Sequence, residues 1–85
     1  MENKKNIYIK EINLNELKIN QKGIIKEITT TGTIKRRFLD LGLVKGTPII
    51  PVLVSPTKEP RAFEVRGSVI AIRKEDAQKI LVCLT

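Results

Sequence analysis

The amino-acid sequence predicts a mostly β fold: a small barrel of about five antiparallel strands, with one helix after the first strand and one short helix before the last. Short runs rich in Ile, Val and other aliphatic residues predict the strands. Glycine, proline and threonine turns separate these runs, and only two segments have helical spacing. At 85 residues the chain is expected to form one domain, residues 1–85, with a core over 12–84 and an N-terminal extension over 1–11.

The N-terminal part is expected to enter the core in extended form. Residues Ile12 to Ile19 alternate aliphatic and polar side chains, with one short helical turn near Asn15 to Leu17. The first full strand is predicted over Ile24 to Thr29, because Gly23 ends the preceding turn and β-branched residues dominate the run after it.

A short helix is predicted next. Ile34, Phe38 and Leu41 have the spacing of one helical stripe, which is expected to face the barrel. Thr33 is expected to be the N-cap, because its hydroxyl can accept a hydrogen bond from a free amide of the first turn. Gly42 is expected to end the helix with a positive φ, so that Leu43 folds back on Phe38.

The second half of the chain is predicted to form a meander of short antiparallel strands. Pro51 is expected at an edge or bulge, because proline cannot donate to a strand ladder. Phe63 and Val65 are expected to point inward, opposite to Glu64 and Arg66. The predicted elements are strands over Pro48 to Val54, Arg61 to Arg66 and Val69 to Arg73, a loop over Ser55 to Pro60, a helix over Lys74 to Ile80, and a last strand containing Val82 and Leu84. This order indicates a barrel of the SH3 type.

Charge and cysteine content narrow the possible partners and the compartment. Sixteen Lys and Arg against nine Asp and Glu give a net charge of +7, which favours acidic partners or serves only solubility. The single Cys83 cannot form an internal disulfide and is interpreted as a small buried hydrophobe. No apolar run is long enough to span a bilayer or form a signal peptide, so a cytoplasmic location is expected.

The inventory of reactive side chains argues against catalysis and against a metal or cofactor site. The chain contains no His, which removes imidazole ligands and the usual acid–base residue near neutral pH. The carboxylates are scattered, and the adjacent Glu75 and Asp76 fit the first turn of a helix. The segment Gly42 to Thr47 lacks the spacing of a phosphate-binding loop. We expect no catalytic residue, no metal ligand and no cofactor.

Several motifs together resemble the ferrous iron transport protein A (FeoA) family. They are Arg36-Arg37-Phe38-Leu39-Asp40-Leu41-Gly42-Leu43, Gly46-Thr47, Val65-Arg66-Gly67, and the run from Ile70 through Ala77 to Ile80. The resemblance covers residues 12–84 and departs from the family at Ser68 and at Lys58-Glu59-Pro60. It implies an SH3-like barrel that acts in the cytoplasm with the membrane GTPase and permease of a bacterial ferrous iron system. Transition-metal binding is implied only at family level, and the link to iron is expected to run through the partner.

The predicted partner-binding residues are Lys35, Arg36, Arg37, Leu39, Arg66 and Arg73. On a helical wheel Leu39 lies between Lys35 and Arg36, away from the stripe that faces the barrel. An exposed leucine flanked by cations is a plausible interface anchor. Two alternatives stay open: the segment Ile7 to Ile12 covers Leu39, or the basic cluster is only a solvated helix face.

Three functions compete. The first is a protein-binding module that regulates or assembles a ferrous iron transporter with a cytosolic GTPase domain. The second is a small basic barrel that binds nucleic acid, which the charge alone favours. The third is an SH3 adaptor that binds proline-rich peptides. With only three aromatic residues the chain lacks the stacking surface that the second and third require. The first is therefore preferred, with a monomer expected.

Overall fold

The computed structural model describes residues 10–52 and 59–84. Within these residues the chain forms a mostly β fold with small helices, which confirms the predicted fold class. In chain order the elements are β1 (Glu11–Asn13), the 3-10 helix η2 (Leu14–Glu16), β2 (Gly23–Ile28), α1 (Gly32–Asp40), β3 (Pro48–Val52), β4 (Arg61–Val65), β5 (Ser68–Ile72), α2 (Lys74–Ala77) and β6 (Ile80–Leu84).

The strands form one antiparallel sheet in the order β1-β6-β2-β3-β4-β5. Strand β3 links its two halves: Pro48 and Ile49 pair with β2, and Ile50 to Val52 pair with β4. Pro51 therefore lies where β3 has a ladder on one side only, as the missing N–H of proline predicts. Its carbonyl instead accepts a hydrogen bond from the Asn20 amide at 2.9 Å.

The core is aliphatic apart from Phe38 and Phe63, and Phe63 and Val65 point inward as predicted. Alternation along the strands and the two helical segments bring these side chains together. The buried hydrophobic residues are Leu14, Leu17, Ile25, Ile28, Phe38, Leu43, Ile49, Phe63, Val65, Ile72, Ala77, Ile80 and Val82.

The number of strands and the length of the second helix differ from the prediction. The N-terminal part of the described chain contains a sixth strand, β1, which pairs with β6 through Ile12 and Val82. The second helix has four residues, Lys74–Ala77, and does not continue to Ile80, because Ile80 pairs with Ile28 and opens β6. Glu75 and Asp76 do occupy its first turn, as predicted.

The prediction that Cys83 is buried is wrong. Ile80 and Val82 point into the core, and the period of two in β6 places Cys83 on the opposite face, where it is half-buried and not bonded to another cysteine. Of the predicted loop over Ser55 to Pro60, only Glu59 and Pro60 fall within the described residues, and residues 7–9 and 53–54 also lie outside them.

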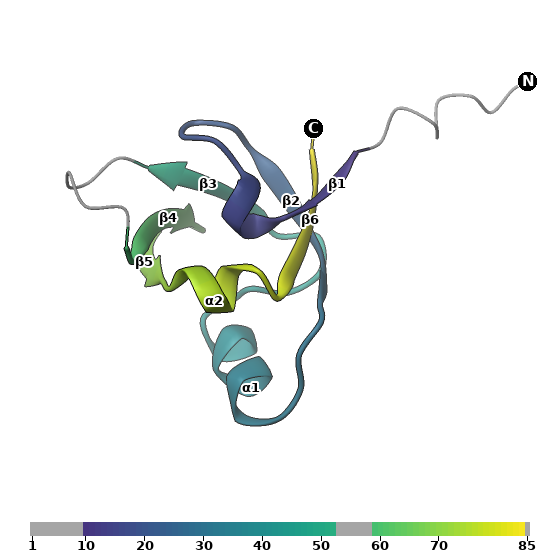
Figure 1. The fold of residues 1–85 in the computed structure, drawn as a ribbon. Coiled ribbons are helices and arrows are strands. Elements are labelled where there is room, and N and C mark those ends of the chain that lie inside the picture. Colours follow the sequence, from purple (N-terminus) through teal and green to yellow (C-terminus); the bar gives the residue numbers. More distant parts are fainter. Residues whose placement is uncertain (1–9, 53–58, 85) are drawn as a thin grey trace, which may run out of the picture.

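The arrangement in Figure 1 separates α1 from most of the sheet. Helix α1 lies at one end of the molecule, and β1, β2, β3 and β6 gather toward the other, with α2 between. Residues 29–31 connect β2 to α1, and residues 41–47 connect α1 to β3. Most of its surface therefore points away from the barrel.

Candidate functional site

Helix α1 presents nearly all its side chains to solvent. Among its nine residues only Phe38 is buried, at 3% exposure, and Ile34 is half-buried against the core. Charged side chains at Lys35, Arg36 and Arg37 give the helix a cationic outer surface. A short helix held by one aromatic side chain presents a large free face, which suits recognition more than core formation.

The end of α1 has the geometry that the sequence predicts. Gly42 has a φ of +90°, and its amide donates to the Leu39 carbonyl at 3.0 Å. The Leu43 amide donates to the Phe38 carbonyl at 3.0 Å, which completes a Schellman motif. Leu43 is fully buried in the same core cluster as Phe38, as expected.

The same reversal makes the prediction for Leu41 wrong. Leu41 follows the last helical residue, Asp40, and is 42% exposed instead of facing the barrel. Gly42 turns the chain so that Leu43 takes the core position that Leu41 would occupy in a longer helix. Leu41 therefore adds a second exposed leucine near Leu39, which sequence spacing alone does not reveal.

The predicted N-cap is also wrong. The helix starts at Gly32, its N-cap is Thr31, and Thr31 makes no side-chain capping hydrogen bond. Thr33 lies inside the first turn and is exposed. The reason is that Gly32, with a φ of +75°, turns the chain into the helix two residues earlier than the polar pattern indicates.

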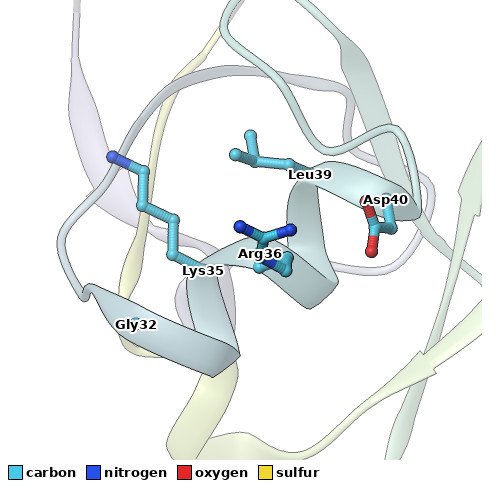
Figure 2. A pocket seen from close by; sticks show the side chains of 5 residues that line it. All are labelled: Gly32, Lys35, Arg36, Leu39 and Asp40. Carbon is cyan, nitrogen blue, oxygen red and sulfur yellow. The ribbon is translucent and has the colours of Figure 1, made fainter.

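Three of the predicted residues line one open hollow on the outer face of α1, together with Gly32 and Asp40. These five residues form two adjacent rows of the helix, Gly32-Arg36-Asp40 and Lys35-Leu39, each with a spacing of four residues. Figure 2 shows Lys35 and Leu39 pointing to the same side of α1, one turn apart. Gly32 has no side chain and leaves the end of the hollow open. Leu39 is 43% exposed, so its apolar surface is accessible between two cations.

The other three predicted residues lie elsewhere. Arg37 is exposed on α1 but does not line the hollow. Arg66 lies at the exit of α1: its Nη2 donates to Thr47 Oγ1 at 3.4 Å, and the Thr47 hydroxyl donates to the Gly42 carbonyl at 3.1 Å. Arg73 is exposed between β5 and α2. The structure thus brings Lys35, Arg36 and Leu39 together, with Arg66 near the end of the same helix.

Two polar side chains have structural roles that the sequence does not signal. Arg61 donates from Nη1 to the Asn15 carbonyl and from Nη2 to the Leu17 carbonyl, both at 2.8 Å, and lies 5.3 Å from the centre of the Phe63 ring. The Glu59 carboxylate accepts a hydrogen bond from the Lys74 amide at 3.0 Å and so caps α2. Both partners are backbone groups distant in sequence, so no local motif encodes them.

Two further observations concern metals and membranes. Among residues 10–52 and 59–84, no three His, Cys, Asp or Glu side chains are placed to hold a metal ion together. In the same part of the chain, none of the helices has the length and apolar character needed to cross a bilayer.

Comparisons with known proteins identify the family. Residues 12–83 match the FeoA domain family. A fusion of Fe(2+) transport protein A with the Fe(2+) transporter FeoB, from Porphyromonas gingivalis, is 30% identical over 69 residues, which are 81% of this chain. The chain spans only 8% of the length of that fusion protein.

Solved structures give the same fold. An FeoA-like protein from Clostridium acetobutylicum superposes with a TM-score of 0.78 and 35% identity, covering 88% of this chain and 87% of the other. FeoA of Stenotrophomonas maltophilia, an SH3 domain protein complexed with zinc and suggested as a ferrous iron transport activating factor, has a TM-score of 0.73 and 27% identity, covering 84% of this chain and 88% of the other. The described barrel is therefore SH3-like, as predicted.

Proposed function

This chain belongs to the FeoA domain family, and from that membership we propose that it is an accessory protein of a bacterial ferrous iron uptake system. In this proposal it binds the cytosolic GTPase region of the membrane transporter and regulates or assembles it. The observation that carries the proposal is the outward face of α1, where Leu39 lies exposed between Lys35 and Arg36 in one hollow. No catalytic step by the chain itself is part of the proposal.

The fusion protein from P. gingivalis supports the choice of partner. One chain there contains both transport protein A and the FeoB transporter. Joining two domains raises their effective concentration, so that even a weak contact is occupied. A separate small chain has no such covalent link, so it needs a surface that binds the transporter without one. In this proposal that surface is the outer face of α1, with Lys35, Arg36 and Leu39.

The α1 face suits a contact of modest affinity with an acidic surface. Burying a leucine side chain fully contributes about 1.5 to 3 kcal/mol. Leu39 is only 43% exposed before binding, so burying the rest of its side chain contributes less than this to the free energy of binding. Lys35, Arg36 and Arg37 attract carboxylates and speed the encounter, while solvent and salt screen their contribution to affinity. Apolar contact and charge therefore act together, and neither alone is sufficient.

The proposed role in iron transport is indirect. The chain has no His, and the described residues hold no cluster of metal-ligating side chains. We assign iron handling to the transporter and recognition to this chain, acting at the cytoplasmic side of the membrane as a monomer.

A nucleic-acid-binding function is the second candidate, because the net charge of +7 attracts phosphates. Both candidates can be tested in one set of titrations. The purified chain is titrated by calorimetry with the cytosolic GTPase region of the transporter, with duplex DNA and with RNA, each at two salt concentrations. We expect saturable binding of the transporter region, and nucleic-acid binding that is weak and disappears at the higher salt.

Substitutions on α1 test whether its outer face is the surface that binds the transporter. We expect Leu39→Asp to weaken transporter binding at least about tenfold, since one lost contact of 1.4 kcal/mol corresponds to that factor. Ile19→Asp is the matched control, because Ile19 is also 43% exposed but lies outside α1. Reversing Lys35, Arg36 and Arg37 to Glu should also weaken binding, whereas the same reversal at the exposed Lys10, Lys18 and Lys22 should do so much less. Equal effects of the α1 variants and their controls would contradict the proposal, as would tight nucleic-acid binding without transporter binding.

A further inference from the structure

We propose that Arg66 is a positioning residue for the outer face of α1. Its side chain fixes the direction in which this helix leaves the barrel, and it does not contact the partner itself. This role rests on the proposed function, because the direction of α1 matters for binding only where its outer face is the bound surface. It differs from the role of partner contact that the sequence predicts for Arg66.

The backbone of Arg66 has a conformation that arginine seldom adopts. Arg66 and Gly67 form the two-residue turn between β4 and β5, with φ values of 53° and 83°. A turn with two positive φ values favours Asn-Gly or Gly-Gly, because a β-carbon on a longer side chain crowds the backbone there. The turn by itself would therefore be more stable with asparagine in place of arginine. A residue held against its local preference points to a role for its side chain.

The Arg66 side chain lies against the end of α1. Its Cδ and Nε are 3.4 Å and 3.5 Å from the position that a β-carbon on Gly42 would occupy, so the side chain crosses Gly42 where that residue has no side chain of its own. Its Nη2 donates to Thr47 Oγ1 at 3.4 Å, and the Thr47 hydroxyl donates to the Gly42 carbonyl at 3.1 Å. Arg66 therefore joins the β4–β5 turn to the residue at which α1 ends.

Thr47 is a fixed point of the barrel. It is 2% exposed, and its carbonyl accepts a hydrogen bond from the Ile25 amide of β2 at 2.9 Å. Its hydroxyl stands between Arg66 and Gly42, and accepts from the first while it donates to the carbonyl of the second. The C-terminal end of α1 is thus held from two sides, by β2 through Thr47 and by the β4–β5 turn through Arg66.

These contacts give α1 a direction in addition to an attachment. Phe38 is the only buried residue of the helix, and one buried ring does not by itself fix the angle of a helix axis. The contacts at Gly42 act about one turn further along the chain and supply a second point. Arg66 does not line the hollow that contains Lys35 and Leu39, so it acts on that hollow through the helix.

Residual dipolar couplings of the free chain measure the direction of α1. The variant Arg66→Asn removes the guanidinium and suits the turn, because asparagine tolerates a positive φ. We expect a melting temperature no lower than that of the native chain, together with changed amide couplings of Gly32–Asp40 relative to those of the strands. Arg73→Asn is the matched control, because it removes an exposed arginine after β5 and should leave the couplings of α1 unchanged.

Calorimetric titration with the cytosolic GTPase region of the transporter measures the consequence for binding. Arg66→Asn should weaken binding at least about threefold. Arg66→Lys should do the same, because lysine keeps the charge but lacks the planar guanidinium that crosses Gly42. Thr47→Val should also weaken binding, although Thr47 is buried and cannot touch a partner. The double variant of Arg66→Asn and Thr47→Val should bind about as weakly as either single variant, since both break one link.

Three results would overturn this role of Arg66. The first is that the couplings of Gly32–Asp40 are unchanged in Arg66→Asn, or change equally in Arg73→Asn. The second is native binding by Thr47→Val. The third is native binding by Arg66→Lys together with weak binding by Arg66→Asn, which would make Arg66 a charged contact of the partner. If the native chain does not bind the transporter region, the proposed function is wrong, and the couplings of the free chain still decide whether Arg66 directs α1.

Discussion

At the residue scale, Arg61 is the side chain that joins the N-terminal turn to the barrel. It donates two hydrogen bonds, to the carbonyls of Asn15 and Leu17, and lies over the Phe63 ring. We predict that Arg61→Ala lowers the free energy of unfolding by about 2 kcal/mol, since two charge-assisted hydrogen bonds are lost from a half-buried site. Urea denaturation measures this loss.

The control for this prediction is Arg36→Ala, which removes an exposed arginine from α1 and should change stability by less than about 0.5 kcal/mol. If the two variants lose the same stability, Arg61 does not have the role that its geometry indicates.

Gly42 is the second residue at which a single substitution is informative. Its φ of +90° is unfavourable for any residue with a β-carbon, and a β-carbon there would lie 3.4 Å from Cδ of Arg66. Gly42→Ala should therefore destabilise the fold by about 1 to 2 kcal/mol, measured by thermal unfolding. Gly42→Asn should lose less, because asparagine tolerates this conformation better. A neutral Gly42→Ala would show that the helix end can relax.

At the element scale, α1 is attached to the barrel mainly through Phe38. Removing that ring leaves a cavity, and Phe38→Ala should cost about 3 to 5 kcal/mol. Leu41→Ala changes a side chain that is 42% exposed and should cost less than about 1 kcal/mol. Denaturation of the two variants side by side tests which apolar residue anchors the helix. A larger loss of stability for Leu41→Ala would show that Leu41 packs against the barrel, as the helical spacing of the sequence predicts.

The ion pair between Lys26 and Glu11 links β2 to β1 and predicts a pH dependence. The hydrogen bond to the Glu11 carboxylate raises the pKa of Lys26 above its ordinary value of 10.5. A raised pKa in the folded state stabilises the fold below the unfolded pKa, and that contribution is lost as the pH rises through the folded value.

The difference in melting temperature between the native chain and Lys26→Met should therefore be constant from about pH 7 to about pH 9.5 and shrink above about pH 10.5. A difference that grows with pH would contradict the assignment.

At the scale of the whole molecule, the sequence predicts the barrel because the residues that end each strand or helix lie next to that element in the sequence. Turns at Gly42 and Gly67 divide the chain, and alternation places Phe63 and Val65 inward. The family motifs then give the SH3-like type, which the comparisons confirm.

Features that depend on distant parts of the chain are not predictable in this way. Strand β1 forms because it pairs with the edge of β6. Helix α2 ends where it does because Ile80 pairs with Ile28. For the candidate site, a helical wheel places Leu39 between Lys35 and Arg36 but cannot show that Leu41 leaves the stripe. That exposure results from the chain reversal at Gly42, which exchanges Leu41 for Leu43 in the core.

The most direct test of the central claim, that the outer face of α1 binds the transporter, is an amide chemical-shift map. The ¹⁵N-labelled chain is mixed with the unlabelled cytosolic GTPase region of the transporter. We predict that shifts and line broadening concentrate on Gly32–Asp40 and on Leu41, with Lys35, Arg36 and Leu39 among the most affected. Perturbations confined to β1, β2 and β6, at the other end of the molecule in Figure 1, would contradict the claim.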